Sequence, residues 1–395
     1  MRNFRSIYIA LCIAGLLAPL GAGAQFYSSG DDPASAKWME SSSAHFRIIY
    51  PVGLDSLAKV YAAELERFRE AEEWSSGYLP GEKYSRKMPV VLHPWNAVSN
   101  GSVTWAPMRM DLYTVPDHTG SDPLPWATTL AVHESRHVSQ MQLGNDGLFR
   151  PLNWLFGEVI PGGVAAVYPS TYFLEGDAVT AETALTGAGR GRRGDFLSYY
   201  MAAFDRGDYR NWYRWRWGSY RHYAPDHYAL GYMTIAGARW MYDDPLFTAD
   251  YFKKVRNNPL RINNIQKAFK ARSGKRFKAA YKDIMEAFHD VWSEAAEARA
   301  PFTEGERVTP AQSWHTEYIN LAESDEGLLA MRSGKTGTAR LVLIGNDGET
   351  SLKVFSESAG PVIAIGDKVY WGEIVPDIRY GLKKTSRIRY MSLKD

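Results

Sequence analysis

Two histidines and a glutamate stand at a spacing that suits metal chemistry. His133, Glu134 and His137 form the pattern H-E-x-x-H within residues 127–142, a run with helical periodicity. On a helix, side chains four positions apart lie one turn above each other, so the two imidazoles can bind one zinc ion. Glu134 lies beside them and can act as the general base for a zinc-activated water. The pattern predicts a zinc-dependent hydrolase.

The surroundings of this short motif favour the metal interpretation. Three fixed residues occur by chance in roughly one chain in a hundred of this length. The plain alternative is a surface helix with two ordinary histidines and a solvated glutamate. Leu130, Val132 and Val138 instead make the helix apolar enough to be buried. Burying two imidazoles and a carboxylate without partners is costly, and a bound metal removes that cost.

A second helix, expected at 171–183, carries the candidate third ligand. A catalytic zinc site needs a third protein ligand besides an open position. H-E-x-x-H followed by an aromatic-rich E-G-x-A helix resembles the gluzincin metallopeptidases, especially the peptidase MA-like group of exported bacterial proteins. This resemblance implies that Glu175 is the third zinc ligand; a helix-start carboxylate is its plain alternative. Glu158 and Asp177 are weaker ligand candidates, and Glu182 is a candidate partner that orients a ligand histidine.

Residues 225–232 supply another point of resemblance. Tyr228 and Gly231 fit the Y-x-x-G segment that opens a later gluzincin helix, although Pro225 lies two residues further away than in that pattern. The resemblance implies that Tyr228 is a neutral donor to the oxyanion of the tetrahedral intermediate. His227 and Tyr223 are the next candidates, and aromatic packing is the alternative.

The chain also departs from the aminopeptidase members of that family. The gap between His137 and Glu175 is longer than theirs, and no G-x-M-E-N motif precedes the zinc helix. We therefore expect no aminopeptidase activity. The resemblance covers roughly residues 44–298 and rests on the three short segments above.

The N-terminal residues predict export. Arg2 and Arg5 precede an apolar run over residues 7–20 and an A-x-A site, which indicates a signal peptide of residues 1–24. Cys12, the only cysteine, lies within it, so the mature chain has no thiol. Removing the signal leaves equal numbers of basic and acidic residues, and this balance argues against a nucleic-acid partner. We expect a periplasmic, extracellular or outer-membrane-associated protein.

Hydrophobic periodicity predicts an α+β fold with a small N-terminal sheet and a mostly helical remainder. Residues 25–43 are expected to be a flexible lead-in and 44–299 the metallopeptidase-like domain. Within it the patterns predict strands at 45–51, 88–93 and 108–115, and helices at 54–74, 228–242, 247–255, 262–271 and 275–298. The alternating strand 108–115 is predicted to be a sheet edge, which in gluzincins receives an extended peptide.

Two segments of the domain have open interpretations. Residues 148–168 are apolar but too interrupted to span a bilayer. They fit a lid, a patch in peripheral contact with a membrane surface, or a helical hairpin packed on the core, which is favoured. The Gly/Arg-rich residues 187–194 are expected to form an exposed loop whose arginines contact substrate carboxylates.

Residues 300–395 change to short alternating runs separated by turns. They resemble the opening of a TolB-like β-propeller. A blade takes about 40–50 residues, so about two blades fit, and two cannot close a ring. The segment is therefore expected to be an incomplete propeller from a truncated or longer protein, or else a small partial sheet.

These observations predict an exported zinc metallopeptidase that acts on a peptide or protein substrate. Its metal ligands are His133, His137 and Glu175, and its catalytic residues are Glu134 and Tyr228. One alternative is a non-catalytic zinc-bound scaffold of the envelope or surface, and another is a zinc hydrolase for a non-peptide amide or ester.

Overall fold

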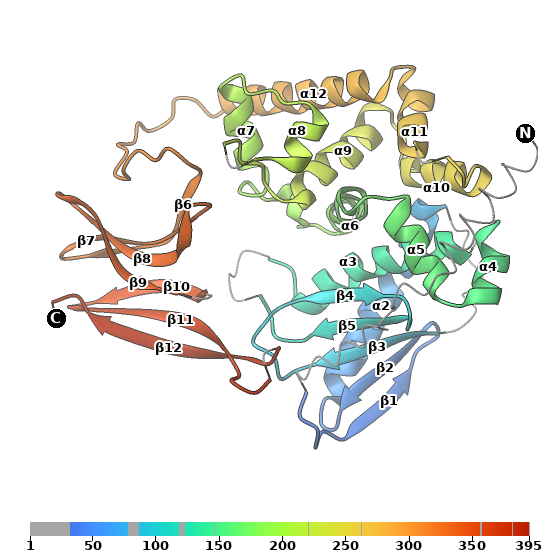
Figure 1. The fold of residues 1–395 in the computed structure, drawn as a ribbon, viewed down its shortest axis with the longest axis horizontal. Helices are drawn as coiled ribbons and strands as arrows, with labels where there is room; N and C mark the ends of the chain where they lie inside the picture. The colour runs from blue at the N-terminus through green and yellow to red at the C-terminus, as the bar shows by residue number, and fades with distance from the viewer. Residues whose placement is uncertain are drawn as a thin grey trace, which may run out of the picture.

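The computed structural model describes residues 32–77, 87–117, 123–145, 147–219, 221–261, 263–355, 358–380 and 382–394. Within them the chain forms an α+β fold with eleven α-helices and three sheets, as the sequence predicts. Figure 1 shows the helices above the N-terminal sheet, with the two C-terminal sheets beside both. The predicted signal peptide lies outside the described residues.

The N-terminal sheet has five strands in the order β1-β2-β3-β5-β4. Their bounds are Trp38–Ser42, Phe46–Pro51, Met88–His93, Gly101–Thr104 and Arg109–Tyr113 for β1 to β5. The three inner strands are parallel, and β1 and β4 pair antiparallel at the edges. Apolar side chains of the inner strands, such as Ile48, Val90 and Leu112, are buried beneath α2 and α3.

Two predictions about this sheet are wrong. The predicted flexible lead-in, 25–43, contains strand β1, which pairs in register with β2. Its side chains, Trp38 and Met39 included, are largely exposed and do not alternate between apolar and polar, so the sequence gives little sign of the pairing with β2. The strand at 109–113 is not an edge, since β4 pairs with it and forms the edge of the sheet. The four residues of β4 are too short and half-buried to show an alternating pattern.

The predicted helices are present, each within two residues of its predicted bounds, whereas the helices Ser198–Asp205 and Trp212–Trp217 are not among the predictions. The bounds of the helices are Asp55–Ser76 (α2), Trp126–Met141 (α3), Phe149–Phe156 (α4), Val159–Val167 (α5), Thr171–Leu185 (α6), Ser198–Asp205 (α7), Trp212–Trp217 (α8), His227–Met241 (α9), Phe247–Asn257 (α10), Asn264–Ser273 (α11) and Phe277–Glu297 (α12). In the described part of the chain, none of them is long and apolar enough to cross a membrane.

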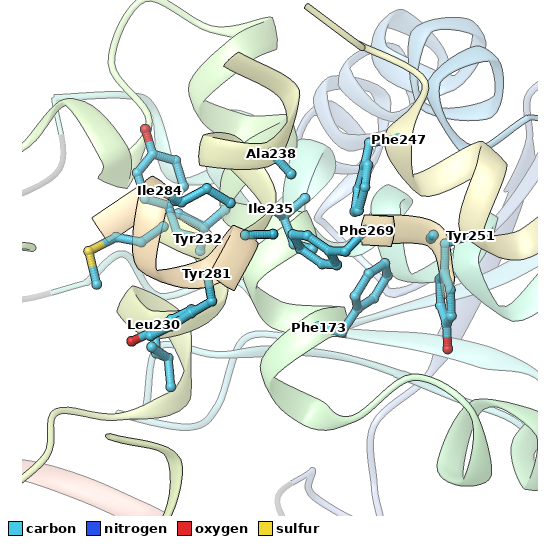
Figure 2. Packing of buried hydrophobic residues seen from close by; sticks show 14 of the residues in the cluster. Phe173, Leu230, Tyr232, Ile235, Ala238, Phe247, Tyr251, Phe269, Tyr281 and Ile284 are labelled. Carbon is cyan, nitrogen blue, oxygen red and sulfur yellow. The ribbon is translucent and has the colours of Figure 1, made fainter. Parts of the chain in front are cut away.

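An aromatic-rich core holds the helical half together around α6 and α9. Figure 2 shows its packing, in which Phe247 lies against Phe269 with ring centroids 4.8 Å apart. Phe173 of α6 packs on Tyr251 at 4.6 Å. Burial of such large rings stabilises the helices by about 1.5–3 kcal/mol for each side chain. This core fixes the helix that carries Glu175.

The glycines of the two sequence motifs meet where α6 crosses α9. A Cβ added to Gly176 would lie 2.1 Å from the carbonyl carbon of Gly231, and one added to Gly231 would lie 1.9 Å from the carbonyl oxygen of Tyr172. Neither position has room for a side chain. The backbones of α6 and α9 therefore approach each other directly, and this contact sets the distance between Glu175 and Tyr228.

The C-terminal strands form two antiparallel meanders. One sheet contains β6 to β9 and the other β10 to β12, with bounds Thr316–Ser324 (β6), Gly327–Gly334 (β7), Gly337–Gly345 (β8), Gly348–Val354 (β9), Ser358–Ile365 (β10), Lys368–Pro376 (β11) and Lys384–Ser392 (β12). They share a core that includes Leu341, Val369 and Trp371. The described strands do not close a ring. The stacked rings of Tyr223 and His315, 3.4 Å apart, join this part to the helices.

Candidate metal centre

Three side chains from two helices converge at the crossing of α3 and α6. His133 and His137 lie one turn apart on α3, and Glu175 comes from the first turns of α6. The Nε2 atoms of the two histidines are 3.3 Å apart. Glu175 Oε2 lies 3.2 Å from His133 Nε2 and 3.3 Å from His137 Nε2. The three predicted ligands are therefore brought together as a candidate metal-binding triad.

The spacing of these three atoms fits a tetrahedral metal ion. Ligand atoms at about 2.0–2.1 Å from a tetrahedral centre stand roughly 3.3–3.4 Å from one another. The observed separations of 3.2 to 3.3 Å match the edges of one face of that tetrahedron. Two imidazole nitrogens and one carboxylate oxygen form a donor set suited to zinc rather than to magnesium or calcium.

The charges around the triad favour a bound cation. Burial lowers the pKa of His137, but its hydrogen bond to Glu175 and the charges of Glu175 and Glu134 raise it to about 9. The pKa of His133 is also raised, since hydrogen bonds to Glu175 and Glu182 outweigh burial. Burial raises the pKa of Glu175, yet its bonds to both imidazoles hold it well below its usual range. The pocket is thus arranged to hold positive charge.

Glu134 lies close against the backbone of Gly101 and has one carboxylate oxygen without a partner among the described residues. A Cβ on Gly101, the first residue of β4, would lie 2.6 Å from Glu134 Oε1. Oε2 is buried and accepts no hydrogen bond from the described residues. Burial raises the pKa of this carboxyl group, although the nearby histidines lower it. An unsatisfied buried carboxylate oxygen beside two histidines is placed to receive a proton from a water molecule.

Hydrogen bonds orient both imidazoles toward the triad. His137 Nδ1 lies 2.9 Å from Gln140 Oε1, so a proton on Nδ1 leaves Nε2 free as a ligand. His133 Nδ1 lies 3.4 Å from Glu182 Oε2 and 2.9 Å from Arg190 Nη2. Because a guanidinium can only donate, a proton on Nδ1 is accepted by Glu182 and the contact with Arg190 is then not a hydrogen bond. Glu182 therefore occupies the orienting position that the sequence suggests for it.

Arg190 is a site residue that sequence reasoning placed in the wrong environment. The predicted exposed loop turns inward, and the guanidinium lies against Glu182, with Nε 2.7 Å from Oε1. Its Nη2 atom is 2.9 Å from His133 Nδ1, and its Cζ atom stacks 4.6 Å from the ring centre of Tyr228. The Gly/Arg-rich composition resembles a solvated loop. The ion pair with the buried Glu182 explains why the side chain of Arg190 points toward the site.

A buried ionic network supports the triad from behind. Arg136, on a neighbouring side of α3, donates to both carboxylate oxygens of Asp177 at 2.6 and 3.0 Å and to Glu72 at 3.2 Å. Gln140 donates to Asp177 at 2.9 Å, so one side chain links this network to His137. Thr248 of α10 also donates to Asp177, at 2.6 Å. Asp177 is thus a structural anchor and not a metal ligand.

An open cavity of about 360 Å³ leads to the triad. It is bordered by residues 99–103, by the face of α3 that carries His133, Glu134 and His137, and by Arg190, Arg193 and Tyr228. The ring of Tyr228 lies 6.2 Å from that of His133. Burial, followed by the charge of Glu175, raises the pKa of Tyr228 to about 12, which keeps its hydroxyl protonated. A protonated hydroxyl on the cavity wall can donate to a bound oxyanion.

The remaining candidates lie elsewhere. Glu158 accepts a hydrogen bond from the backbone nitrogen of Met108 at 2.6 Å. His227 stacks on Tyr228 with ring centroids 4.5 Å apart but does not line the cavity, and Tyr223 stacks on His315. The strand β4 is a further part of the site that its sequence did not reveal.

Comparison with known proteins adds no relative. No family model matches the chain, and a search of curated proteins returns no similar sequence.

Proposed function

We propose that this chain is an exported zinc-dependent peptidase of the gluzincin type. The observation that carries the proposal is the separation of 3.2 to 3.3 Å among the three ligand atoms of His133, His137 and Glu175. A buried carboxylate with a free oxygen lies beside them. Zinc held by the triad would polarise a water molecule and the substrate carbonyl.

The remaining chemistry is assigned to side chains of the cavity. Glu134 Oε2 takes a proton from the attacking water and passes it to the leaving amine. Its raised pKa brings it closer to the range in which a carboxylate can both accept and return a proton. Tyr228 donates its hydroxyl hydrogen to the developing oxyanion. Arg190 holds Tyr228 and Glu182 in place, so it is a positioning residue.

The neighbouring sheet edge favours a peptide substrate. Strand β4 pairs with β5 on one side only, and its residues 101–103 border the cavity. An edge strand beside a cleft can pair with an extended peptide through backbone hydrogen bonds. An ester or a simple amide cannot form this series of backbone hydrogen bonds. This difference supports a peptidase over a zinc hydrolase that acts on esters or simple amides.

Two isosteric substitutions test the proposal. Glu134→Gln should keep zinc near one ion per chain but reduce peptide cleavage by about a thousandfold or more, because the base is lost. Glu175→Gln should lower the zinc content itself, since a carboxamide is a poor zinc ligand. Glu70→Gln, at an exposed position of α2, is the matched control and should change neither quantity.

Metal analysis and cleavage of a peptide library are the measurements. Full cleavage by Glu134→Gln contradicts the assignment of the base. Unchanged zinc content in Glu175→Gln moves the third ligand elsewhere. A wild-type protein that holds zinc but cleaves neither peptides nor esters supports the non-catalytic scaffold instead.

A further inference from the structure

The hairpin of α4 and α5 exposes an unusual amount of apolar surface. Leu148, Leu152 and Leu155 lie at spacings of four and three residues, so they share one outward face of α4. Trp154 of the same helix is 87 % exposed. We call the exposed large apolar residues of α4 and of the turns at its two ends the hairpin face: Leu148, Leu152, Trp154, Leu155, Phe156 and Val159. Monomeric soluble proteins rarely expose so many large apolar groups together, and such patches mark interaction sites.

The hairpin is held firmly from its inner side. Phe149 is buried against Tyr168, with ring centroids 5.7 Å apart. Asn153 donates to the side chain of Asn145, and Glu158 accepts from the backbone of Met108. The only acidic side chain of residues 147–168 is thus turned inward. The outward apolar side is therefore a fixed feature of the fold.

A strongly basic segment lies beside this hairpin. Residues 251–282 contain eleven lysines or arginines and no aspartate or glutamate. The hydroxyl of Tyr168, at the end of α5, donates to the carbonyl of Pro259, and the backbone of Arg256 lies beside Gly147 at the start of α4. Figure 1 shows α4, α5, α10 and α11 at the same side of the molecule.

The loop between α10 and α11 combines both kinds of side chain. Leu260 is 98 % exposed and is followed by the exposed Arg261. Arg272 and Lys275 are engaged with acidic neighbours. In contrast, Lys253, Lys254 and Arg261 form no ion pair with any of the described residues. Their charge is available to an anionic partner.

We infer that the hairpin face and the basic segment together dock on the surface of an anionic phospholipid membrane. Side chains such as Trp154 and Leu260 project from separate elements instead of lining a groove, so they suit insertion among acyl chains more than a protein pocket. Aromatic and aliphatic groups next to lysine and arginine are the pattern of interfacial membrane binding. The inference is independent of the proposed function, because none of these residues lines the metal cavity.

Sedimentation of the purified protein with vesicles tests the inference. The protein should bind vesicles of phosphatidylcholine mixed with phosphatidylglycerol, and bind pure phosphatidylcholine much more weakly. Lys253→Gln with Lys254→Gln should weaken binding to the anionic vesicles by about fivefold for each cation removed. Trp154→Ala should weaken it by at least about tenfold, because a large inserted apolar side chain is lost.

Matched control variants distinguish binding through this surface from nonspecific adsorption to vesicles. Trp217→Ala removes a tryptophan that is 72 % exposed on α8, and Lys353→Gln with Lys368→Gln removes two exposed lysines of the C-terminal sheets. Both controls should bind as the wild type does, and circular dichroism confirms that every variant is folded. Raising salt from about 0.1 M to about 1 M should weaken binding, since the Debye length falls from about 10 Å to about 3 Å.

Three outcomes would overturn the inference. One is no binding to anionic vesicles, and another is equal loss in the control variants. The third is a dimer in analytical ultracentrifugation that Trp154→Ala converts to a monomer, because a second copy of the chain would then be the partner.

Discussion

The crossing of α6 and α9 makes a quantitative prediction for Gly231→Ala. The new Cβ would lie 1.9 Å from the carbonyl oxygen of Tyr172, and real Cβ contacts are essentially never closer than 3.0 Å. The two helices must therefore separate by roughly 1 Å, and the obstacle is backbone that cannot rotate away. Overpacking of this kind costs about 1–3 kcal/mol. Alanine is the better helix former by about 1 kcal/mol, so the clash must outweigh a favourable effect.

The matched control is Gly163→Ala on α5. A Cβ at Gly163 meets nothing within 4 Å, so the same substitution should be neutral or stabilising by up to about 1 kcal/mol. Urea unfolding gives the free energy of unfolding for both variants, and the two should differ in sign. If Gly231→Ala is as stable as Gly163→Ala, the close approach of the helices is wrong.

The same substitution also reports on the site. Glu175 precedes Gly176 on α6, and Tyr228 lies one turn before Gly231 on α9. A shift of roughly 1 Å between the helices should therefore move Tyr228 relative to the triad. Misplacement by about 1 Å can cost about a hundredfold in rate. Zinc content should fall little, since His133 and His137 remain on α3. If Gly231→Ala loses its zinc but keeps full cleavage, the prediction is wrong.

Two further predictions concern charged groups away from the triad. Asp177→Asn should lower the free energy of unfolding by about 3–5 kcal/mol, because Arg136 loses its buried counter-charge; a urea midpoint within error of the wild type would refute this. Burial lowers the pKa of His93, but hydrogen bonds to Asp111 and Asp32 raise it from 6.5 to about 9. Its contribution to stability is complete below pH 6.5 and is lost as pH rises through about 9. His93→Gln should remove up to roughly 3 kcal/mol of this pH dependence, measured by urea unfolding at the two ends of that range; an unchanged dependence would assign it to another group.

The sequence predicts long periodic elements and local motifs well. The predicted bounds of the helix at 126–141 and of the strand at 88–93 agree with the structure within one residue. The strand alternates in burial, and the helix is a long apolar segment buried on nearly every side. The spacing of His133 and His137 follows directly from the helix geometry. Glu175 was reached through family resemblance, and the structure brings it to the same point in space.

Features that depend on distant partners were not predictable. Strand β1 is held by backbone pairing, and β4 is too short to show a period. Arg190 is half-buried because its guanidinium pairs with Glu182, which lies eight residues earlier on α6. Gly176 and Gly231 are needed because the backbones of α6 and α9 touch at these positions, and this contact is visible only in the folded structure. Such pairings belong to the tertiary fold and leave no mark in local composition.

The network around Asp177 has a consequence for how the protein could acquire its metal. It ties α2, α3, α6, α9 and α10 together through Glu72, Arg136, Asp177, Arg239 and Thr248 without using a metal ligand. The scaffold is thus assembled by the chain's own charges. In zinc fingers, by contrast, metal binding and folding are one event. A chain built in this way can fold before any metal is bound, so a metal ion held by His133, His137 and Glu175 could be removed and replaced without unfolding the protein.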